Sequence, residues 1–367
     1  MRRLRKVLLT TGLVLLLGVG MGAAWLAHKN AIGPVSPEDM KLATVTPTGV
    51  FDKEASCFHV GGYDAFIAGI RKRNPAWRPK LWLLPWMFPR DTYETAQRTL
   101  DCRAVRYESD GLAIQGWMVG PKDVPPGKRL PVLIYNRGGN GGFGATYFPQ
   151  AMTFLFPYAQ DGFLVLASQY RGVDDDPEVA AVDQFGGDDV HDVERLLNLV
   201  DRLPQADPDN IFMLGVSRGV MMSYLVARNT DRIRALAAIN GDADLEASLQ
   251  FRPEMEELYK LRMPDYATHK HELLAQRSVL RWAEELPRGM PILMLHGSRD
   301  ERVDPSNGPR LKQRLDALGH PNKLVMYEGD DHFLRANRDQ AHQEVVSWFR
   351  AHLEASADAV AAASSEP

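Results

Sequence analysis

The sequence predicts an α/β fold in which a mainly parallel sheet is covered by helices on both faces. Short apolar runs at residues 131–136, 163–168 and 211–214 have no polar alternation, as expected of strands buried on two sides. Helix-type stretches separate these runs, and such crossover connections make neighbouring strands parallel. Before them, Asp110-Gly111 joins two strand-like stretches as a tight hairpin, which adds an antiparallel edge to the sheet.

Composition limits the classes of partner. The chain has 367 residues, of which 45% are hydrophobic, enough for a sizeable core. The net charge is −4 and no helix carries a basic stripe, so nucleic acid is not expected as a partner. Cys57 and Cys102 are the only cysteines, which excludes both a cysteine cluster for zinc and a dense disulfide framework.

The first 29 residues read as a signal peptide or an N-terminal membrane anchor. A basic start is followed by an apolar run over residues 7–27, and small residues end at Ala24, where a signal peptidase could cut. The run also approaches the ~20 residues that span a bilayer, so anchoring through 7–27 stays open. Either outcome places the remaining chain in the periplasm or outside the cell, where a Cys57–Cys102 bridge is permitted.

Residues 30–100 precede the main domain. Residues 30–50 are proline-containing and lack apolar periodicity, which predicts a linker, and 51–100 is expected to be helical in pieces between prolines. An aromatic cluster at 77–88 has two interpretations. It packs this helical segment onto the main domain, or it lies near a membrane or over a substrate pocket.

The main domain is expected over residues 101–353, followed by a flexible tail at 354–367. A long charged, helix-prone insertion at 240–287 interrupts the strand and helix alternation, and it is predicted to form a cap above the carboxyl ends of the strands, where open α/β sheets bind ligands. The expected strands are 102–109, 112–119, 131–136, 163–168, 211–214, 235–239, 292–295 and 323–327, and the expected helices are 188–201, 221–228, 309–318 and 337–353.

The turn between the strand ending near 214 and the helix at 221–228 reads Gly215-Val216-Ser217-Arg218-Gly219. G-x-S-x-G between a strand and a helix is a nucleophile elbow, which lifts the Ser217 hydroxyl clear of the sheet. The amide of Arg218 could then donate to a developing oxyanion, worth about 3 to 4 kcal/mol. The alternative is a serine that only caps the helix.

A nucleophilic serine needs a base and an acid, which follow it on this scaffold. Asp300 comes directly after the predicted strand 292–295, and His332 lies between the strand at 323–327 and the last helix. We therefore predict Asp300 as the acid and His332 as the base, with Asp304 as the reserve acid. The histidines at 320 and 342 lack a comparable position at a strand end.

The glycine-rich stretch 135–142 follows an early strand and is the expected source of the second oxyanion donor, through the backbone of Arg137, Gly138 or Gly139. It contains none of the phosphate-binding glycine motifs, so no nucleotide cofactor is predicted. Carboxylates cluster at 174–176 and 188–189, but such clusters are usually solvated or cap helices, and no metal is assigned.

With these motifs in view, the chain resembles the catalytic domain of the prolyl oligopeptidase family, in the α/β-hydrolase superfamily, from about Cys102 to His352. The matching pieces are Tyr-Asn-Arg-Gly-Gly-Asn at 135–140, Gln-Tyr-Arg-Gly at 169–172, Gln-Phe-Gly-Gly-Asp-Asp-Val at 184–190, the elbow, His-Gly-Ser-Arg-Asp at 296–300 and Asp-His at 331–332. The resemblance implies a Ser217, Asp300 and His332 triad, an oxyanion hole from the amides of Arg218 and the 137–139 turn, and peptidase activity.

The sequence departs from that family in two places. The helical 51–100 segment stands where larger relatives carry a β-propeller, and the oxyanion loop reads Asn-Arg-Gly-Gly where many relatives have His-Gly-Gly. We expect an exported serine hydrolase that forms an acyl-enzyme with short peptides or acyl amides. Carboxylic esters are the alternative substrates, a binding module on an inactive scaffold is the rival class, and the oligomeric state stays open.

Overall fold

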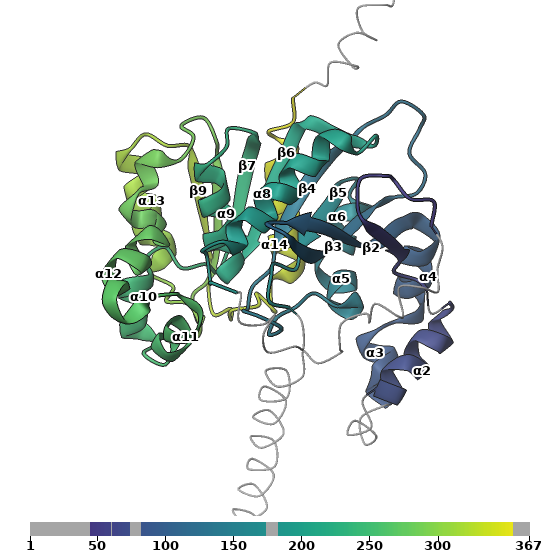
Figure 1. Cartoon of the computed structure of the whole chain (residues 1–367), viewed down its shortest axis with the longest axis horizontal. Helices are drawn as coiled ribbons and strands as arrows, with labels where there is room; N and C mark the ends of the chain where they lie inside the picture. Colours follow the sequence, from purple (N-terminus) through teal and green to yellow (C-terminus); the bar gives the residue numbers. More distant parts are fainter. Residues whose placement is uncertain (1–44, 60, 74–81, 174–182, 355–367) are drawn as a thin grey trace, which may run out of the picture.

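The computed structural model describes residues 45–59, 61–73, 82–173 and 183–354 (Figure 1). The predicted export segment, most of the predicted linker, the carboxylates at 174–176 and the tail after residue 354 lie outside the described residues. Within them, no helix is long and apolar enough to cross a membrane.

One mixed sheet of nine strands organises the described chain, in the order β1-β2-β3-β5-β4-β6-β7-β8-β9. Pairs among β1, β2, β3 and β5 are antiparallel, and all pairs from β5 through β4 to β9 are parallel. The strands are β1 (Lys53–Ser56), β2 (Leu100–Ser109), β3 (Leu112–Pro121), β4 (Leu130–Asn136), β5 (Leu164–Ser168), β6 (Ala206–Val216), β7 (Ile233–Ile239), β8 (Ile292–Gly297) and β9 (Asn322–Tyr327).

Helices cover both faces of this sheet. Alternate residues of β4 point to opposite faces, so that Val132 and Ile134 join one apolar core while Leu133 and Tyr135 join the other. The first core is closed by α8 (Asp189–Leu199), α9 (Arg218–Arg228) and α13 (Asn307–Ala317), and the second by α2 (Tyr63–Arg73), α4 (Arg90–Thr99), α5 (Phe148–Phe154), α6 (Phe156–Gln160) and α14 (Arg338–Arg350).

The predicted α/β-hydrolase fold is therefore confirmed, including the antiparallel hairpin of β2 and β3. Asp110 and Gly111 at its turn both have positive φ angles, 51° and 77°, as a two-residue hairpin of this hand requires. Two helices, α5 and α6, were not predicted, because prolines at 149 and 157 interrupt the apolar pattern there. Each of these prolines lies in the first turn of its helix, where its missing N–H is not needed.

Two expectations for the N-terminal part were wrong. Residues 51–100 are not only helical, because β1 pairs with β2 along the edge of the sheet. The linker prediction fails for its last residues, since Val50 is buried in the core and the Thr48 amide donates to the Glu54 carboxylate at 2.7 Å. A four-residue edge strand with one buried side chain has too little alternation to be recognised in a sequence.

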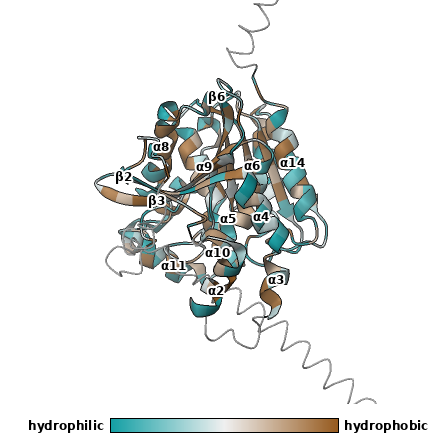
Figure 2. Cartoon of the chain, turned by 90° about the vertical axis from the view of Figure 1, so that its right-hand side faces the viewer, coloured by the Kyte–Doolittle hydropathy of each residue, from teal (hydrophilic) through white to brown (hydrophobic). Residues whose placement is uncertain are grey.

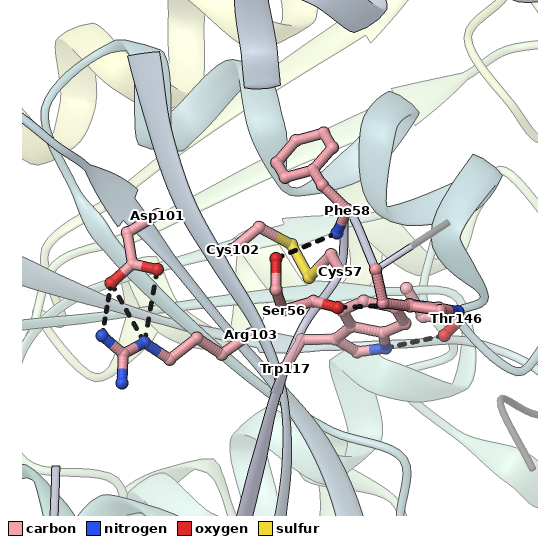
Figure 3. Close-up of a disulfide and its surroundings, with 9 residues drawn as sticks. Ser56, Cys57, Phe58, Asp101, Cys102, Arg103, Trp117 and Thr146 are labelled. Carbon is pink, nitrogen blue, oxygen red and sulfur yellow. Dashed lines mark hydrogen bonds and ion pairs between the residues drawn. A yellow bond between two sulfur atoms is a disulfide. The ribbon is translucent and has the colours of Figure 1, made fainter. Parts of the chain in front are cut away.

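A disulfide joins Cys57, just after β1, to Cys102 in β2 (Figure 3). It closes a segment of 45 residues that contains α2, α3 (Leu84–Met87) and α4, and so holds these helices to the sheet. In the chain-entropy model a closure of this length adds about 4 kcal/mol to the free energy of unfolding.

The region that was predicted as a cap contains α10 (Leu245–Phe251), α11 (Met255–Arg262) and α12 (Tyr266–Gln276), followed by two short 3-10 turns. These helices group together at the end of the molecule where β9 and α13 lie (Figure 1). Asp244 begins the first of them by accepting a hydrogen bond from the Ala247 amide at 3.3 Å.

Candidate active site

The turn between β6 and α9 places Ser217 in a strained backbone, with φ 56° and ψ −126°. A non-glycine residue in this region is uncommon and usually functional. The Ser217 amide donates to the Ile239 carbonyl of the neighbouring strand at 2.9 Å, which holds the turn over the sheet edge. The residue is partly exposed, whereas nearly all of α9 behind it is buried. The sequence therefore presents one hydroxyl at the start of a buried helix.

The glycines on either side of this turn are required by space. A Cβ atom at Gly219 would lie 1.9 Å from the Asn136 carbonyl oxygen, and one at Gly215 would lie 2.4 Å from the Gly219 carbonyl oxygen. Real Cβ atoms do not approach backbone this closely, so any side chain would move the strand away from the helix. The two glycines let α9 start directly against β4 and β6.

His332 and Asp300 are joined by a hydrogen bond of 2.7 Å between the histidine Nδ1 and the carboxylate Oδ2. Both side chains are buried, and the other oxygen of Asp300 accepts hydrogen bonds from the amides of Arg302 and Val303 at 2.7 and 3.0 Å. This carboxylate can therefore fix the tautomer and orientation of the imidazole. Within the described residues no hydrogen bond joins the Ser217 hydroxyl to His332, and such contacts often form only in the substrate complex.

Asn240 links three of the loops that build the site. It directly follows β7 and has a positive φ of 50°. Its amide nitrogen Nδ2 donates to the His332 carbonyl at 2.8 Å, and its Oδ1 accepts from the Gly297 amide at 2.9 Å. Asn240 was not predicted, although its position directly after an apolar strand is the same signal that pointed to Asp300.

The loop after β4 passes directly over the serine. A Cβ atom added at Gly138 would lie 3.0 Å from the Ser217 Cβ and 3.5 Å from its Oγ. The peptide between Arg137 and Gly138 has its carbonyl bound by the Tyr170 hydroxyl at 3.2 Å. Since a trans peptide points its N–H opposite to its C=O, the Gly138 amide faces away from Tyr170. This amide and that of Arg218 are the two candidate oxyanion donors.

The side chain of Arg137 holds this loop from inside. The guanidinium is 2% exposed and donates to the carbonyls of Gly138 and Gly141, both at 2.9 Å, and to that of Gln169 at 2.6 and 3.0 Å. Burial lowers the pKa of Arg137 to about 10, which leaves the group charged at neutral pH. The charged guanidinium of Arg137 thus holds the backbone carbonyls of this loop and of Gln169 in place.

Arg218 holds the same loop from the other side. Its guanidinium forms two hydrogen bonds of 2.8 Å with Asp183, contacts Asp189, and donates to the Gly139 carbonyl at 3.1 Å. Asp183 in turn accepts from the Gly141 amide at 2.5 Å. Burial opposes ionisation of Asp183, but the charge and hydrogen bonds of Arg218 hold the pKa of this carboxyl well below its ordinary value. Asp183 was not predicted, because it carries no motif.

Asp242 is a second carboxylate close to the acid and base, and it too was not predicted. It lies two residues after Asn240, where the predicted cap begins, and its carboxylate accepts a hydrogen bond from the Ser248 hydroxyl. Burial raises the pKa of Asp242 to about 6, with the charges of His332 and Asp300 acting on it in opposite directions.

The remaining candidate residues lie apart from this arrangement. Asp304, the reserve acid, caps its own turn by accepting from the Ser306 amide at 2.9 Å and does not contact the histidine. His320 contacts the Pro287 carbonyl at 3.1 Å, and His342 pairs with Asp161 on α14's face of the sheet. Among the described residues no group of three or more histidine, cysteine or carboxylate side chains could hold a metal ion.

The helices of the 240–287 region, and the residues at their ends, contact two of the loops that surround the site. Tyr259 of α11 packs its ring 5.4 Å from that of Phe185, and Arg277 donates to the Phe185 carbonyl at 2.8 Å. At the other end, Arg252 donates to the Arg302 carbonyl at 3.2 Å, in the loop that carries Asp300. These helices therefore connect the oxyanion side of the site to its acid and base side.

A model described as the prolyl oligopeptidase family matches residues 148–356, more than half of the chain. The chain belongs to the prolyl oligopeptidase family. The match contains Ser217, Asp300 and His332, whereas the loop with Arg137 and Gly138 precedes it.

Three curated relatives match this chain at low sequence identity. An uncharacterised peptidase of Bacillus subtilis, YuxL, is 26% identical over 266 residues, which cover 66% of this chain and 38% of that protein. A second, YtmA, is 24% identical, and the match covers 66% of this chain and 91% of that protein. Dipeptidyl-peptidase 5 of Porphyromonas gingivalis is 24% identical over 62% of this chain and 34% of its own length. This chain thus spans about a third of the length of several relatives.

Solved structures show the same fold. An acylaminoacyl peptidase of Pyrococcus horikoshii superposes with a TM-score of 0.61 at 20% identity, covering 71% of this chain and 43% of that one. A puromycin-hydrolysing peptidase of Mycobacterium tuberculosis gives 0.58 at 20% identity, covering 68% and 39%. A dienelactone hydrolase of Klebsiella pneumoniae gives 0.52 at 18% identity, covering 68% and 98%. The fold alone is therefore shared with two proteins named as peptidases and with one named as a dienelactone hydrolase.

Proposed function

We propose that this chain is an exported serine peptidase that cleaves short peptides or acyl amides through an acyl-enzyme. The observation that carries the proposal is the elbow: Ser217 is strained and partly exposed, and a Cβ atom at Gly138 would lie 3.5 Å from its hydroxyl. The Ser217 amide binds the end of β7, where Asn240 in turn holds the loop of the buried His332–Asp300 pair. In this mechanism Ser217 attacks the acyl carbon, His332 removes its proton, and Asp300 stabilises the imidazolium.

The oxyanion of the tetrahedral intermediate is stabilised by backbone amides. The Gly138 and Arg218 amides are the donors, because the side chains of Arg137 and Arg218 are already bonded to carbonyls and carboxylates. His332 then donates its proton to the leaving amine, which leaves the acyl group on Ser217. In the second half of the reaction water attacks the acyl carbon, and His332 takes the proton of the water and returns it to Ser217. Nothing in this mechanism requires a cofactor or a metal.

Peptides come first among the substrates because relatives are named as peptidases, including a dipeptidyl-peptidase and an acylamino-acid-releasing enzyme. The same catalytic groups act on esters, since the serine and the oxyanion donors contact only the carbonyl. Export is supported by the basic and apolar start of the sequence and by the Cys57–Cys102 disulfide, which persists in oxidising compartments.

The test pairs a probe with a substrate screen. A fluorophosphonate should label the wild type and the exposed-serine control Ser306→Ala, and it should not label Ser217→Ala. Purified protein is then assayed against aminoacyl-arylamides, unactivated peptides and short acyl esters, with Ser217→Ala as the blank. Ser217-dependent cleavage of an unactivated peptide supports the peptidase. Ester turnover with no amide cleavage across varied peptides would mean that the protein is an esterase and not a peptidase. Labelling of Ser217→Ala would show that Ser217 is not the nucleophile.

A further inference from the structure

Two tryptophans are the most exposed large apolar side chains in the described part of the chain. Trp82, in the turn before α3, is 75% exposed, and Trp86, within α3, is 81% exposed. They are four residues apart, so both rings lie on one side of the same turn. Leu84 between them is fully buried and anchors that turn to the protein. Figure 2 shows α3 as a largely hydrophobic ribbon at the edge of the molecule.

The turn that carries these tryptophans is firmly held. The Phe88 carbonyl at its end accepts a hydrogen bond from the Tyr63 hydroxyl at 2.7 Å, and the Phe88 ring packs edge-on against Phe66 of α2 at 5.7 Å. Helices α2 and α3 lie side by side at the same end of the molecule in both views (Figures 1 and 2). The exposed indole rings therefore belong to a fixed surface of the protein.

Helix α2, which lies beside α3, ends in exposed basic residues (Figure 1). Arg71 and Lys72, in the last turn of α2, are exposed, and no carboxylate among the described residues forms an ion pair with either. In the sequence, residues 71–87 include five basic residues and no acidic one, although the whole chain has a net charge of −4. A local excess of basic and tryptophan residues thus lies within a slightly acidic protein.

We propose that Arg71, Lys72, Trp82 and Trp86, here called the α2–α3 surface, rest on an anionic lipid bilayer. Tryptophan rings favour the boundary between headgroups and acyl chains, and basic side chains nearby are attracted to anionic headgroups. This pairing of charge and indole matches a lipid surface better than a protein partner, because two highly exposed tryptophans project from one short turn and exposed basic residues end the neighbouring helix.

The sequence outside the structure brings such a surface within reach. The apolar run at residues 7–27 is long enough to enter a bilayer, and 17 residues separate it from Val45, the first described residue. A fully extended connection of that length spans at most about 60 Å. A domain tethered within that distance meets the membrane at high effective concentration, so even a weak surface contact becomes populated.

The experiment uses the full chain with Trp25→Phe, which removes the tryptophan within the N-terminal segment itself. The protein is mixed with vesicles of phosphatidylcholine alone or with 30% phosphatidylglycerol, each also prepared with brominated acyl chains that quench tryptophan on contact. We expect brominated anionic vesicles to quench part of the emission, and Trp82→Phe with Trp86→Phe to remove at least half of that quenched part. Arg71→Gln with Lys72→Gln should reduce quenching severalfold only with anionic vesicles.

Leu261→Ala is the matched control, since Leu261 is 72% exposed on α11 and should leave the quenching unchanged. Equal quenching in the wild type and the double tryptophan variant would overturn the proposal. It would also be overturned if the wild type, but not that variant, dimerises without lipid in sedimentation. Binding of an oligonucleotide through Arg71 and Lys72, with no effect of vesicles, would likewise replace the lipid by nucleic acid.

Discussion

The two sides of the candidate active site are held by opposite chemistry, although both lie at the carboxyl edge of one sheet. On the oxyanion side, the buried guanidiniums of Arg137 and Arg218 donate to the carbonyls of the 138–141 turn. On the acid and base side, buried acceptors bind backbone N–H groups: Asp300 accepts from two amides, and Asn240 accepts from Gly297. Guanidinium donors to carbonyls thus predominate on one side and acceptors of backbone amides on the other, although Asp183 also accepts from the Gly141 amide and Asn240 also donates to the His332 carbonyl.

This difference has a direct consequence for catalysis. On the oxyanion side, the Tyr170 hydroxyl holds the Arg137 carbonyl, so the Gly138 amide of the same trans peptide faces the other way and can donate to an anion. Where amides are held by a carboxylate, that carboxylate keeps its remaining oxygen for an imidazole N–H. The oxyanion side thus leaves an amide N–H available for the substrate, and the acid and base side leaves a carboxylate oxygen available for the histidine.

The largest effect is expected on the acid and base side. Asp300→Asn should lower kcat by about 10⁴-fold, because a neutral amide neither fixes the histidine tautomer nor stabilises its protonated form. Steady-state kinetics on the best arylamide substrate would measure this. The control is Asp304→Asn, whose carboxylate only caps a turn. If Asp304→Asn proved the more severe, the pairing of Asp300 with His332 would have no catalytic meaning.

The next largest effect tests the buried cation of the oxyanion side. Arg218→Met leaves Asp183 and Asp189 buried without their partner and should lower the free energy of unfolding by about 3 to 5 kcal/mol in urea. Arg228→Met on the same helix is the control. Its partner Glu285 is 3.7 Å away and mostly exposed, so a loss of about 1 kcal/mol or less is expected. If both variants lost the same free energy of unfolding, the buried ion pairs of Arg218 would stabilise the protein no more than a surface ion pair does.

Gly138→Ala examines the oxyanion side without changing charge. The new Cβ would meet Ser217 at 3.0 Å, and we expect kcat to fall by about 10² to 10³-fold, comparable to the loss of one oxyanion donor. Gly142→Ala in the same loop has open space around the new Cβ and no positive φ, so it should retain activity. Comparable activity in the two variants would place the oxyanion donors elsewhere.

The smallest effect concerns Asp242, the carboxylate on the acid and base side that no backbone amide compensates in the described structure. Its pKa of about 6 exceeds the ordinary 3.8, so between these values the native protein holds a proton that the unfolded chain has released. The free energy of unfolding therefore falls as pH rises through that window. Because the side chain is partly exposed, we expect about 1 to 2 kcal/mol.

Asp242→Asn should remove that decline. The difference in the free energy of unfolding between variant and wild type should grow in favour of the variant from pH 4 to pH 7.5, measured by urea denaturation. Asp231→Asn, at an exposed loop position, is the control and should leave the pH dependence as it is in the wild type. A pH-independent difference for Asp242→Asn would show that its carboxylate does not titrate in this window.

Much of the fold was readable from local pattern. Most inner strands are continuous apolar runs, and β4, β5, β7, β8 and β9 were each predicted within a few residues of their observed bounds. Strand β6 was also predicted, but it begins five residues before the predicted start at 211. The hairpin turn followed from Asp110-Gly111 alone. Edge strand β1 and helices α5 and α6 were not predicted, because their short sequences owe their structure to the sheet on which they pack.

The candidate site divides in the same way. The sequence by itself determined which residues follow a strand in the loops at the sheet edge, and Ser217, Asp300 and His332 were predicted as the catalytic groups because that position and a motif coincide. Only the tertiary structure decided that the side chains of Arg137 and Arg218 face inward and hold the glycine-rich loop. It also decided that Asp183 lies between Arg218 and Gly141. In the same way, it placed Asn240 where it joins His332 to Gly297. Such contacts link residues 32 to 92 positions apart. They leave no local pattern in the sequence, because the two partners meet only when the chain folds.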